Sequence, residues 1–268
     1  MKRRTAGLAA LALMALAAAA AAADTQDNPY LPVDGADFRS ALSPSGTGAG
    51  TGTGTGTGTV HVAGFLLQRH PVTNAEFLAF VARHPEWRRG AAAPLLADAD
   101  YLGHWQAPDA LGPAAPPRQP ATRVSWFAAE AYCEAQGARL PAWHEWELAA
   151  AASRTVRDAR ADPAWRQQIL DWYARPAGQP LPAVESSAPD VYGLYDLHGL
   201  VWEWVLDANS LMGSDEAQKF CGGGALSVSQ KENFAVLMRV AMLSSLRARD
   251  TGHALGFRCA RDLAEPPQ

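Results

Sequence analysis

The chain has 268 residues, of which 48% are hydrophobic and 19% charged, so it can bury the core of one large domain or two small ones. Its formal net charge of -4, from 23 Lys and Arg against 27 Asp and Glu, argues against nucleic acid or an anionic membrane surface as a partner. Nine Trp, 23 Gly and 19 Pro favour a loop-rich fold over a helical bundle.

The N-terminus has the pattern of a secretory signal. Basic residues at 2–4 precede an uncharged run over 6–23 that is rich in Ala and Leu, and small residues stand just before Asp24. A membrane anchor is the alternative, but an alanine-rich run is weakly apolar and no stop-transfer charges follow it. We expect a signal peptide over 1–23, export of residues 24–268 to the periplasm of a Gram-negative bacterium, and no membrane span after cleavage.

The first part of the exported chain alternates turns with short apolar runs. Turn-forming pairs such as Leu31-Pro32 surround a short predicted strand near Phe38. The nearly pure Thr/Gly alternation at 46–59 has no large apolar side chain to bury, so we expect a flexible surface insertion and assign it no function. The apolar positions over 60–67 then predict a strand that enters the core.

A helix start follows at Thr73. Thr73 and Glu76 have the spacing of a capping box, in which each side chain accepts from the other residue's backbone amide. Phe77, Phe80 and Val81 recur at helical spacing behind it. The sequence therefore predicts a short helix with one buried face.

The next segments contain a long loop and two more helices. Ala, Pro and Gly dominate residues 88–120, which predicts a loop with Trp105 as its anchor. Ser125 is expected to cap a helix that runs to Ala135 and stops at Gly137, where a left-handed turn needs no Cβ. Pro141 is expected to open a third helix, with its tryptophans and Ala150 on one face.

The last part of the chain is harder to assign. Residues 156–170 are charged and helical in pattern, and 174–189 form a proline-rich loop. Residues 192–261 are short apolar runs broken by glycines, which predicts strands and turns. Because no internal repeat and no clean linker interrupts the chain, one domain is expected.

Four motifs stand in a fixed order and together resemble a known family. They are Pro71-Val72-Thr73-Asn74 with Phe77, Val124-Ser125-Trp126 through to Glu145-Trp146-Glu147, Tyr192-Gly193-Leu194-Tyr195-Asp196 through to Trp202-Glu203-Trp204, and Gly256-Phe257-Arg258-Cys259-Ala260. Together they resemble the formylglycine-generating enzyme family, also called the sulfatase-modifying-factor domain. The resemblance implies a single α+β domain of the C-type-lectin-like kind, poor in regular secondary structure.

The activity of that family does not transfer with the motifs. Members that oxidise a substrate cysteine to formylglycine carry a Gly-Gly-Ser segment followed by two cysteines that bind copper and use dioxygen. Alignment of that segment with residues 222–224 places Ser227 and Glu232 at the two cysteine positions. A serine hydroxyl is a hard, weak ligand where Cu(I) prefers a soft thiolate. Formylglycine generation by the family's mechanism is therefore not expected.

The three cysteines have separate expected roles. The resemblance implies a disulfide between Cys133, on the second predicted helix, and Cys259, in the Gly-Phe-Arg-Cys motif. Two buried free thiols are the alternative, and export favours the disulfide. Cys221 stands just before three glycines. It is interpreted first as a small buried apolar group, with a redox thiol or one ligand of a rebuilt metal site as alternatives.

The resemblance also implies a structural calcium site. Asp196 and Glu203 would supply carboxylate oxygens, and the turn at Gly199 and Val201 would supply backbone carbonyls, the hard donors that Ca2+ prefers. Glu203 could instead pair with a nearby arginine. His198, in the same turn, is more typical of a hydrogen-bonded loop residue than of a metal ligand, because no partner stands at metal spacing.

Two functions of different class stay open. The first is an accessory or maturation factor for another periplasmic protein, a metalloenzyme of the nitrite-reductase type, because segments 199–204 and 221–225 resemble divergent family members found alongside denitrification proteins. The second is a periplasmic oxidoreductase with a rebuilt, copper- or iron-dependent site in the same cleft. The candidate residues of that site are Cys221, Ser227, Glu232 and Arg239.

Overall fold

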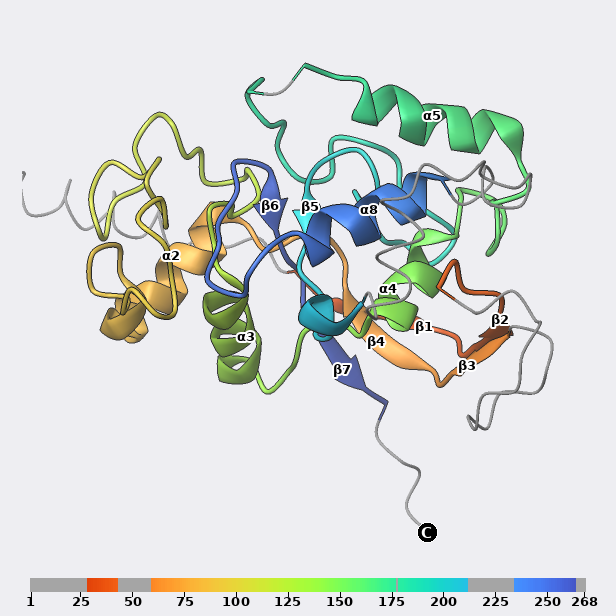
Figure 1. Cartoon of the computed structure of the whole chain (residues 1–268), viewed down its shortest axis with the longest axis horizontal. Helices are drawn as coiled ribbons and strands as arrows, with labels where there is room; N and C mark the ends of the chain where they lie inside the picture. Colours follow the sequence, from red (N-terminus) through yellow and green to blue (C-terminus); the bar gives the residue numbers. More distant parts are fainter. Residues whose placement is uncertain (1–27, 43–58, 177, 212–233, 264–268) are drawn as a thin grey trace, which may run out of the picture.

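The computed structural model describes residues 28–42, 59–176, 178–211 and 234–263. The predicted signal peptide and the Thr/Gly insertion up to residue 58 lie outside these residues, and so do Cys221, Ser227 and Glu232. The described residues form one domain that mixes short helices with small sheets, as expected (Figure 1).

A three-stranded antiparallel sheet brings the two ends of the described chain together. β1 (Tyr30–Val33) and β7 (Ala260–Asp262) flank β4 (Phe65–Gln68). The interpretation of Leu31-Pro32 as a turn was wrong, because Pro32 lies within β1 and pairs with Leu66. A proline lacks an N–H but is tolerated in an edge strand, which is hydrogen-bonded on one side only.

A second small sheet pairs β2 (Ala36–Phe38) with β3 (Val60–Val62), and it confirms the strand expected near Phe38. The single strand expected over 60–67 was wrong: β3 and β4 belong to different sheets. The chain turns between them at Gly64, where a Cβ built on Gly35 would lie 2.5 Å from the Gly64 nitrogen. Two glycines therefore let the backbones pass each other closely.

The first helix forms as its cap predicts. α2 spans Asn74–Arg83, and the Thr73 hydroxyl accepts from the Glu76 amide while Glu76 accepts from the Thr73 amide. Phe77, Phe80 and Val81 are buried on one face. A single 3-10 turn (Pro85–Trp87) then leads into the expected long loop, whose anchor Trp105 is buried and donates to the Asn74 side chain at 3.3 Å.

The next two helices agree with the sequence apart from one boundary. Ser125 caps α3 (Trp126–Ala135), and Gly137 follows it with a φ of 63°. α4 spans Trp143–Ala150. The placement of Pro141 in its first turn was wrong, because Ala142 is the N-cap and its amide donates to the Glu145 carboxylate at 2.7 Å.

Regular structure after residue 156 departs further from expectation. Residues 156–162 are not helical, and α5 spans Pro163–Tyr173. The prediction of only strands and turns over 192–261 was wrong, since α8 (Phe234–Ser244) is an eleven-residue helix. The short strands β5 (Trp202–Glu203) and β6 (Leu255–Gly256) pair in parallel, and a 3-10 turn (Ala208–Ser210) follows β5.

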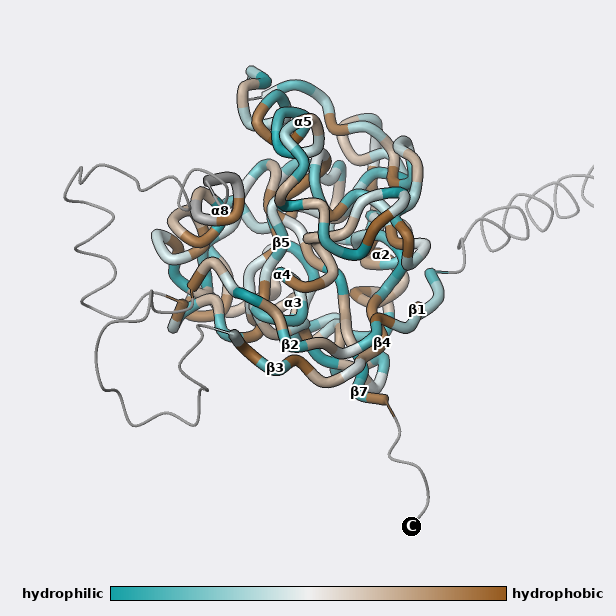
Figure 2. Tube along the Cα trace, turned by 90° about the vertical axis from the view of Figure 1, so that its right-hand side faces the viewer, coloured by the Kyte–Doolittle hydropathy of each residue, from teal (hydrophilic) through white to brown (hydrophobic). Residues whose placement is uncertain are grey.

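The core lies between the sheet, α2, α3 and α4. Phe77, Tyr132 and Phe257 pack with ring centroids 5.3 to 5.9 Å apart. α5 lies at the opposite end of the molecule from β7, in both Figure 1 and Figure 2. Within the described ranges, no helix combines the length and the apolar character that a membrane crossing requires.

Candidate functional site

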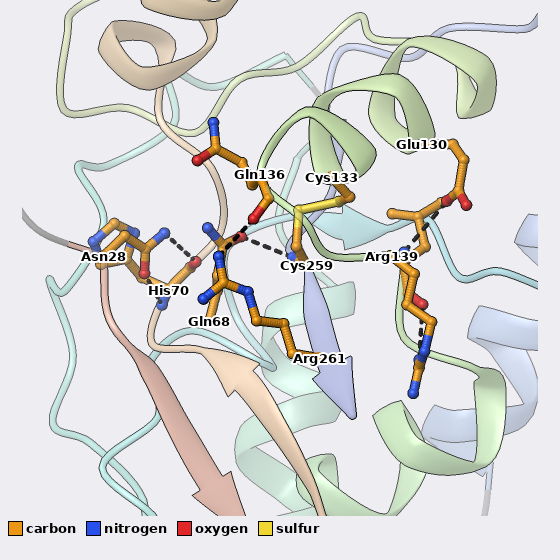
Figure 3. The surroundings of a disulfide bond; sticks show 10 residues. Asn28, Gln68, His70, Glu130, Cys133, Gln136, Arg139, Cys259 and Arg261 are labelled. Carbon is orange, nitrogen blue, oxygen red and sulfur yellow. Dashed lines mark hydrogen bonds between the residues drawn. A yellow bond between two sulfur atoms is a disulfide. The ribbon is translucent and has the colours of Figure 1, made fainter. Parts of the chain in front are cut away.

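The disulfide between Cys133 and Cys259 is present in the structure. It joins α3 to the residue just before β7, with Cα atoms 5.5 Å apart and both residues fully buried. The Gln68 side chain accepts from the Cys259 amide at 2.7 Å, so the bond sits beside the central strand (Figure 3). Because two of the three cysteines form this bond, Cys221 is the one remaining thiol of the sequence.

A buried ion pair links two of the four motifs. Glu203 and Arg258 are both 0% exposed, and they form two hydrogen bonds, Nε to Oε2 at 2.9 Å and Nη2 to Oε1 at 2.8 Å. The Trp146 indole also donates to Oε2, at 3.0 Å. The remaining guanidinium donors reach the Gln68 and Tyr195 carbonyls. Such complete pairing is what allows two charges to stay out of water.

These contacts bear on the predicted calcium ligands. The Glu203 carboxylate forms an ion pair with Arg258. This confirms the alternative in which Glu203 pairs with a nearby arginine. The two Asp196 oxygens accept from the Glu185 amide at 2.7 Å and the Ser187 hydroxyl at 3.0 Å, and the Val201 carbonyl accepts from Arg239 at 3.3 Å.

Three of the four predicted ligands therefore already accept hydrogen bonds from the protein, and the fourth, Gly199, lies in a turn with a φ of 98°. Calcium at these residues stays a prediction, and its check is the melting temperature measured with a chelator and with added calcium.

Arg239, expected to line the cleft, is fully buried on α8 instead. Its guanidinium carbon lies 3.9 Å from the Trp146 ring centroid and 5.4 Å from that of Trp202. Its Nη2 group donates to the Leu197 and Val201 carbonyls. No carboxylate in the described part of the chain lies within ion-pair distance of it. Burial lowers the pKa of Arg239, and the nearby Tyr173 hydroxyl opposes that shift.

A cleft of roughly 770 Å3 opens beside this network, between α5 and the loop 187–198. Asp162, Trp165 and Gln168 of α5 and its cap form one wall, and Asp190 and His198 lie opposite. Burial raises the pKa of Asp190 and lowers the pKa of His198 to about 3. His198 is the hydrogen-bonded loop residue expected, since its Nε2 lies 2.8 Å from the Ala150 carbonyl oxygen.

Sequence reasoning missed both Arg239's ring contacts and this cleft. Trp146 and Arg239 come from helices far apart in sequence, so no local spacing joins them. The cleft likewise forms where α5 lies over a loop, and the helical pattern of α5 does not say which face covers what.

The fold and the site define a class: a single α+β domain, poor in regular structure, that is closed by one disulfide and by an ion pair between its last two motifs. The chain belongs to the FGE-sulfatase family, since the family model described as "Sulfatase-modifying factor enzyme 1-like domain" matches residues 32–263.

Two relatives of equal identity carry opposite names. The formylglycine-generating enzyme of Streptomyces coelicolor is 28% identical over 256 residues, covering 76% of this chain and 80% of that protein. The inactive C-alpha-formylglycine-generating enzyme 2 of Mus musculus is 28% identical over 249 residues, covering 78% and 79%. Among solved structures, PvdO from Pseudomonas aeruginosa is 19% identical with a TM-score of 0.48, covering 87% of this chain and 94% of that one. Sequence identity at this level therefore does not decide activity.

Proposed function

We propose that this protein is an exported member of the family that has lost formylglycine generation and serves as an accessory or maturation factor for a periplasmic metalloenzyme of the nitrite-reductase type. The observation that carries the first half is the thiol count. Cys133 and Cys259 are bonded to each other, which leaves Cys221 alone in a chain of three cysteines. The copper chemistry that the resemblance implies needs two thiolates, and one chain cannot supply them.

Other features support the proposal from different directions. Ser227 and Glu232 stand at the aligned cysteine positions, and neither is a soft ligand. The mouse relative is named an inactive formylglycine-generating enzyme, so the family includes a protein described as lacking this activity. The disulfide and the signal-like pattern over 1–23 both fit an oxidising compartment outside the cytoplasm.

The first test is the family's own reaction. The full chain is incubated with a sulfatase-type cysteine peptide, copper and dioxygen, and the peptide mass is followed for conversion of the thiol to an aldehyde. We expect no conversion above that of peptide and copper alone. Stoichiometric aldehyde formation would overturn the loss of activity.

The second test addresses the partner. Copper nitrite reductase is produced in the periplasm of a host with and without this protein, purified, and assayed for copper per subunit and for nitrite turnover. We expect at least twofold more copper and activity when the protein is present, with an unrelated exported protein as the control. Equal copper loading in both hosts contradicts the maturation role.

Metal analysis of the purified protein separates this proposal from its alternative. A scaffold is expected to hold neither copper nor iron in stoichiometric amount. One equivalent of either metal, lost in a variant with Cys221→Ala, would replace the proposal with a periplasmic oxidoreductase whose rebuilt site uses that thiol.

A further inference from the structure

We propose that the cleft between α5 and the loop 187–198 binds a primary ammonium group, carried by a lysine side chain of a protein or by a small free amine. The argument rests on the groups at the floor of the cleft, all of which accept hydrogen bonds. It does not depend on the maturation role, and the two can fail separately.

Asp190 supplies the first acceptor. Its Oδ1 atom accepts from the Tyr192 amide at 2.8 Å and from the Leu194 amide at 3.0 Å, so the carboxylate is held by its own loop. Its Oδ2 atom is buried and has no hydrogen-bond partner among the described residues. A buried acceptor without a donor lowers the stability of the folded protein, and a donor on a ligand would recover that loss.

His198 supplies the second acceptor. Its Nε2 atom lies 2.8 Å from the Ala150 carbonyl oxygen, and a carbonyl can only accept, so Nε2 carries the proton. Nδ1 then carries a lone pair, and it too is buried without a partner in the part of the chain that the structure describes. The ring cannot turn to satisfy it, because Trp146 and Trp165 pack edge-on to it at 5.7 and 5.4 Å.

Two more carboxylates line the cleft, those of Asp196 and Asp162, and Arg154 is the one cationic side chain in the described part of its lining. The buried charge of Arg239 lies behind this lining and, after burial itself, lowers the pKa of His198. Acceptors and carboxylates together favour a ligand that is positively charged and rich in hydrogen-bond donors, and Trp165 adds an aromatic wall that a cation can contact.

A metal ion fits this set less well than an ammonium group. Within the described residues, no group of three or more His, Cys, Asp or Glu side chains stands close enough to hold one. An ammonium group needs only two or three acceptors and brings its own alkyl chain, for which a cleft of roughly 770 Å3 has room.

Admission of such a ligand requires an outward movement of α5. Ile169 is the one fully buried residue of α5, and the half-buried rings of Trp165 and Tyr173 pack on His198 and Trp202, so an outward shift of the helix has to part these ring contacts. A ligand can thereby reach Oδ2 of Asp190 and Nδ1 of His198, which are shielded while the helix lies in place.

The test is calorimetric titration of the full chain with cadaverine and with the peptide acetyl-Ala-Lys-Ala-amide, at pH 7.5. Asp190→Asn keeps the Oδ1 acceptor and removes the charge, and it should weaken binding of either amine at least tenfold. Asp171→Asn makes the same charge change on an exposed α5 residue outside the cleft, and it should change binding less than twofold. Pentan-1-ol, which has the chain without the charge, should bind at least tenfold more weakly than cadaverine.

Tighter binding of the peptide assigns the site to a lysine of a partner, and tighter binding of cadaverine assigns it to a free amine; both support the proposal. No heat with either amine, equal loss in both variants, or equal binding of pentan-1-ol overturns it. If Asp190→Asn does not fold, the test uses the wild-type protein labelled with nitrogen-15 in its histidines and measured by NMR. The His198 Nδ1 resonance should move with cadaverine and not with pentan-1-ol, and an unmoved resonance overturns the proposal.

Discussion

Two regions of this molecule are held together by different kinds of interaction. The sheet side comprises β1, β4 and β7 with α2, α3 and the loop 88–120, and a disulfide, an ion pair and a cluster of aromatic rings hold it together. The α5 side comprises α5, α8 and the cleft, and α5 buries only Ile169. Bonds between residues distant in sequence hold the first region together, whereas α5 is held mainly by the packing of Trp172 and Tyr173 on Trp202. Each region contains buried polar atoms without a partner among the described residues, for example on His104 in the first and on Asp190 in the second.

The largest expected effect is removal of the disulfide on the sheet side. The bond closes a loop with a sequence separation of 126, so Cys133→Ala with Cys259→Ala should lower the free energy of unfolding by about 4 to 5 kcal/mol in the loop-entropy model. Urea unfolding measures the change. A loss below about 1 kcal/mol would mean that this region does not depend on the bond.

The ion pair should come next. Glu203→Gln leaves the Arg258 guanidinium buried without a charge partner, which should cost about 3 to 5 kcal/mol. Adding Arg258→Met should recover part of that loss, because an apolar side chain then replaces the unpaired charge. Urea unfolding of both variants gives the comparison. If the double variant is no more stable than Glu203→Gln, the unpaired charge is not the cause.

Acid should weaken the sheet side through His104. Burial, helped by Arg123, lowers the pKa of His104 to about 4, and neither ring nitrogen has a hydrogen-bond partner within residues 28–42, 59–176, 178–211 and 234–263. The unfolded chain takes up the proton near pH 6.5 while the folded chain does not, so stability is full above pH 6.5 and falls as the pH drops toward 4.

His104→Leu removes this dependence. Between pH 7.5 and pH 4.5 the wild-type protein should lose roughly 1 to 2 kcal/mol more than the variant, measured by urea unfolding at each pH. Equal losses in the two proteins would place the acid sensitivity elsewhere.

The smallest effect is expected from a matched pair of helix caps. Thr73→Ala removes the cap of α2 and should lower the global free energy of unfolding by about 1 kcal/mol. Asp162→Ala removes the cap of α5, where the Asp162 carboxylate accepts from the Ala164 amide at 2.8 Å.

Ile169 is the one fully buried residue of α5, so this helix can open without the core. Asp162→Ala should therefore raise amide hydrogen exchange within α5 and leave the midpoint of global unfolding almost unchanged. An equal shift of the global midpoint by both variants would show that α5 unfolds together with the core.

The parts of the fold that the sequence predicted depend on contacts a few residues apart. Thr73 with Glu76 marks α2, and Ser125 with Gly137 marks α3, because caps act over a single turn. α8 was missed although Val236, Val240 and Leu243 recur at helical spacing, since the neighbouring glycines favoured strands and turns. β1 was missed because a proline in an edge strand resembles a proline in a turn.

The candidate site divides in the same way. The resemblance brought Cys133 and Cys259 together, and the pairing of Glu203 with an arginine was an open alternative. The position of Arg239 against Trp146 depends on how α8 packs on α4, which no spacing within either helix specifies. The unpaired acceptor of Asp190 likewise depends on the loop conformation, because the loop amides bond to Oδ1 and not to Oδ2.

The closing of the sheet by β7 has a consequence for biosynthesis. Arg258 and Cys259 bond to partners that leave the ribosome far earlier, Gln68, Cys133 and Glu203 among them. A growing polypeptide that has not reached residue 262 therefore lacks a strand of the sheet, and one that has not reached residue 258 also lacks the disulfide and the buried ion pair, so the sheet side is completed late in synthesis of this domain.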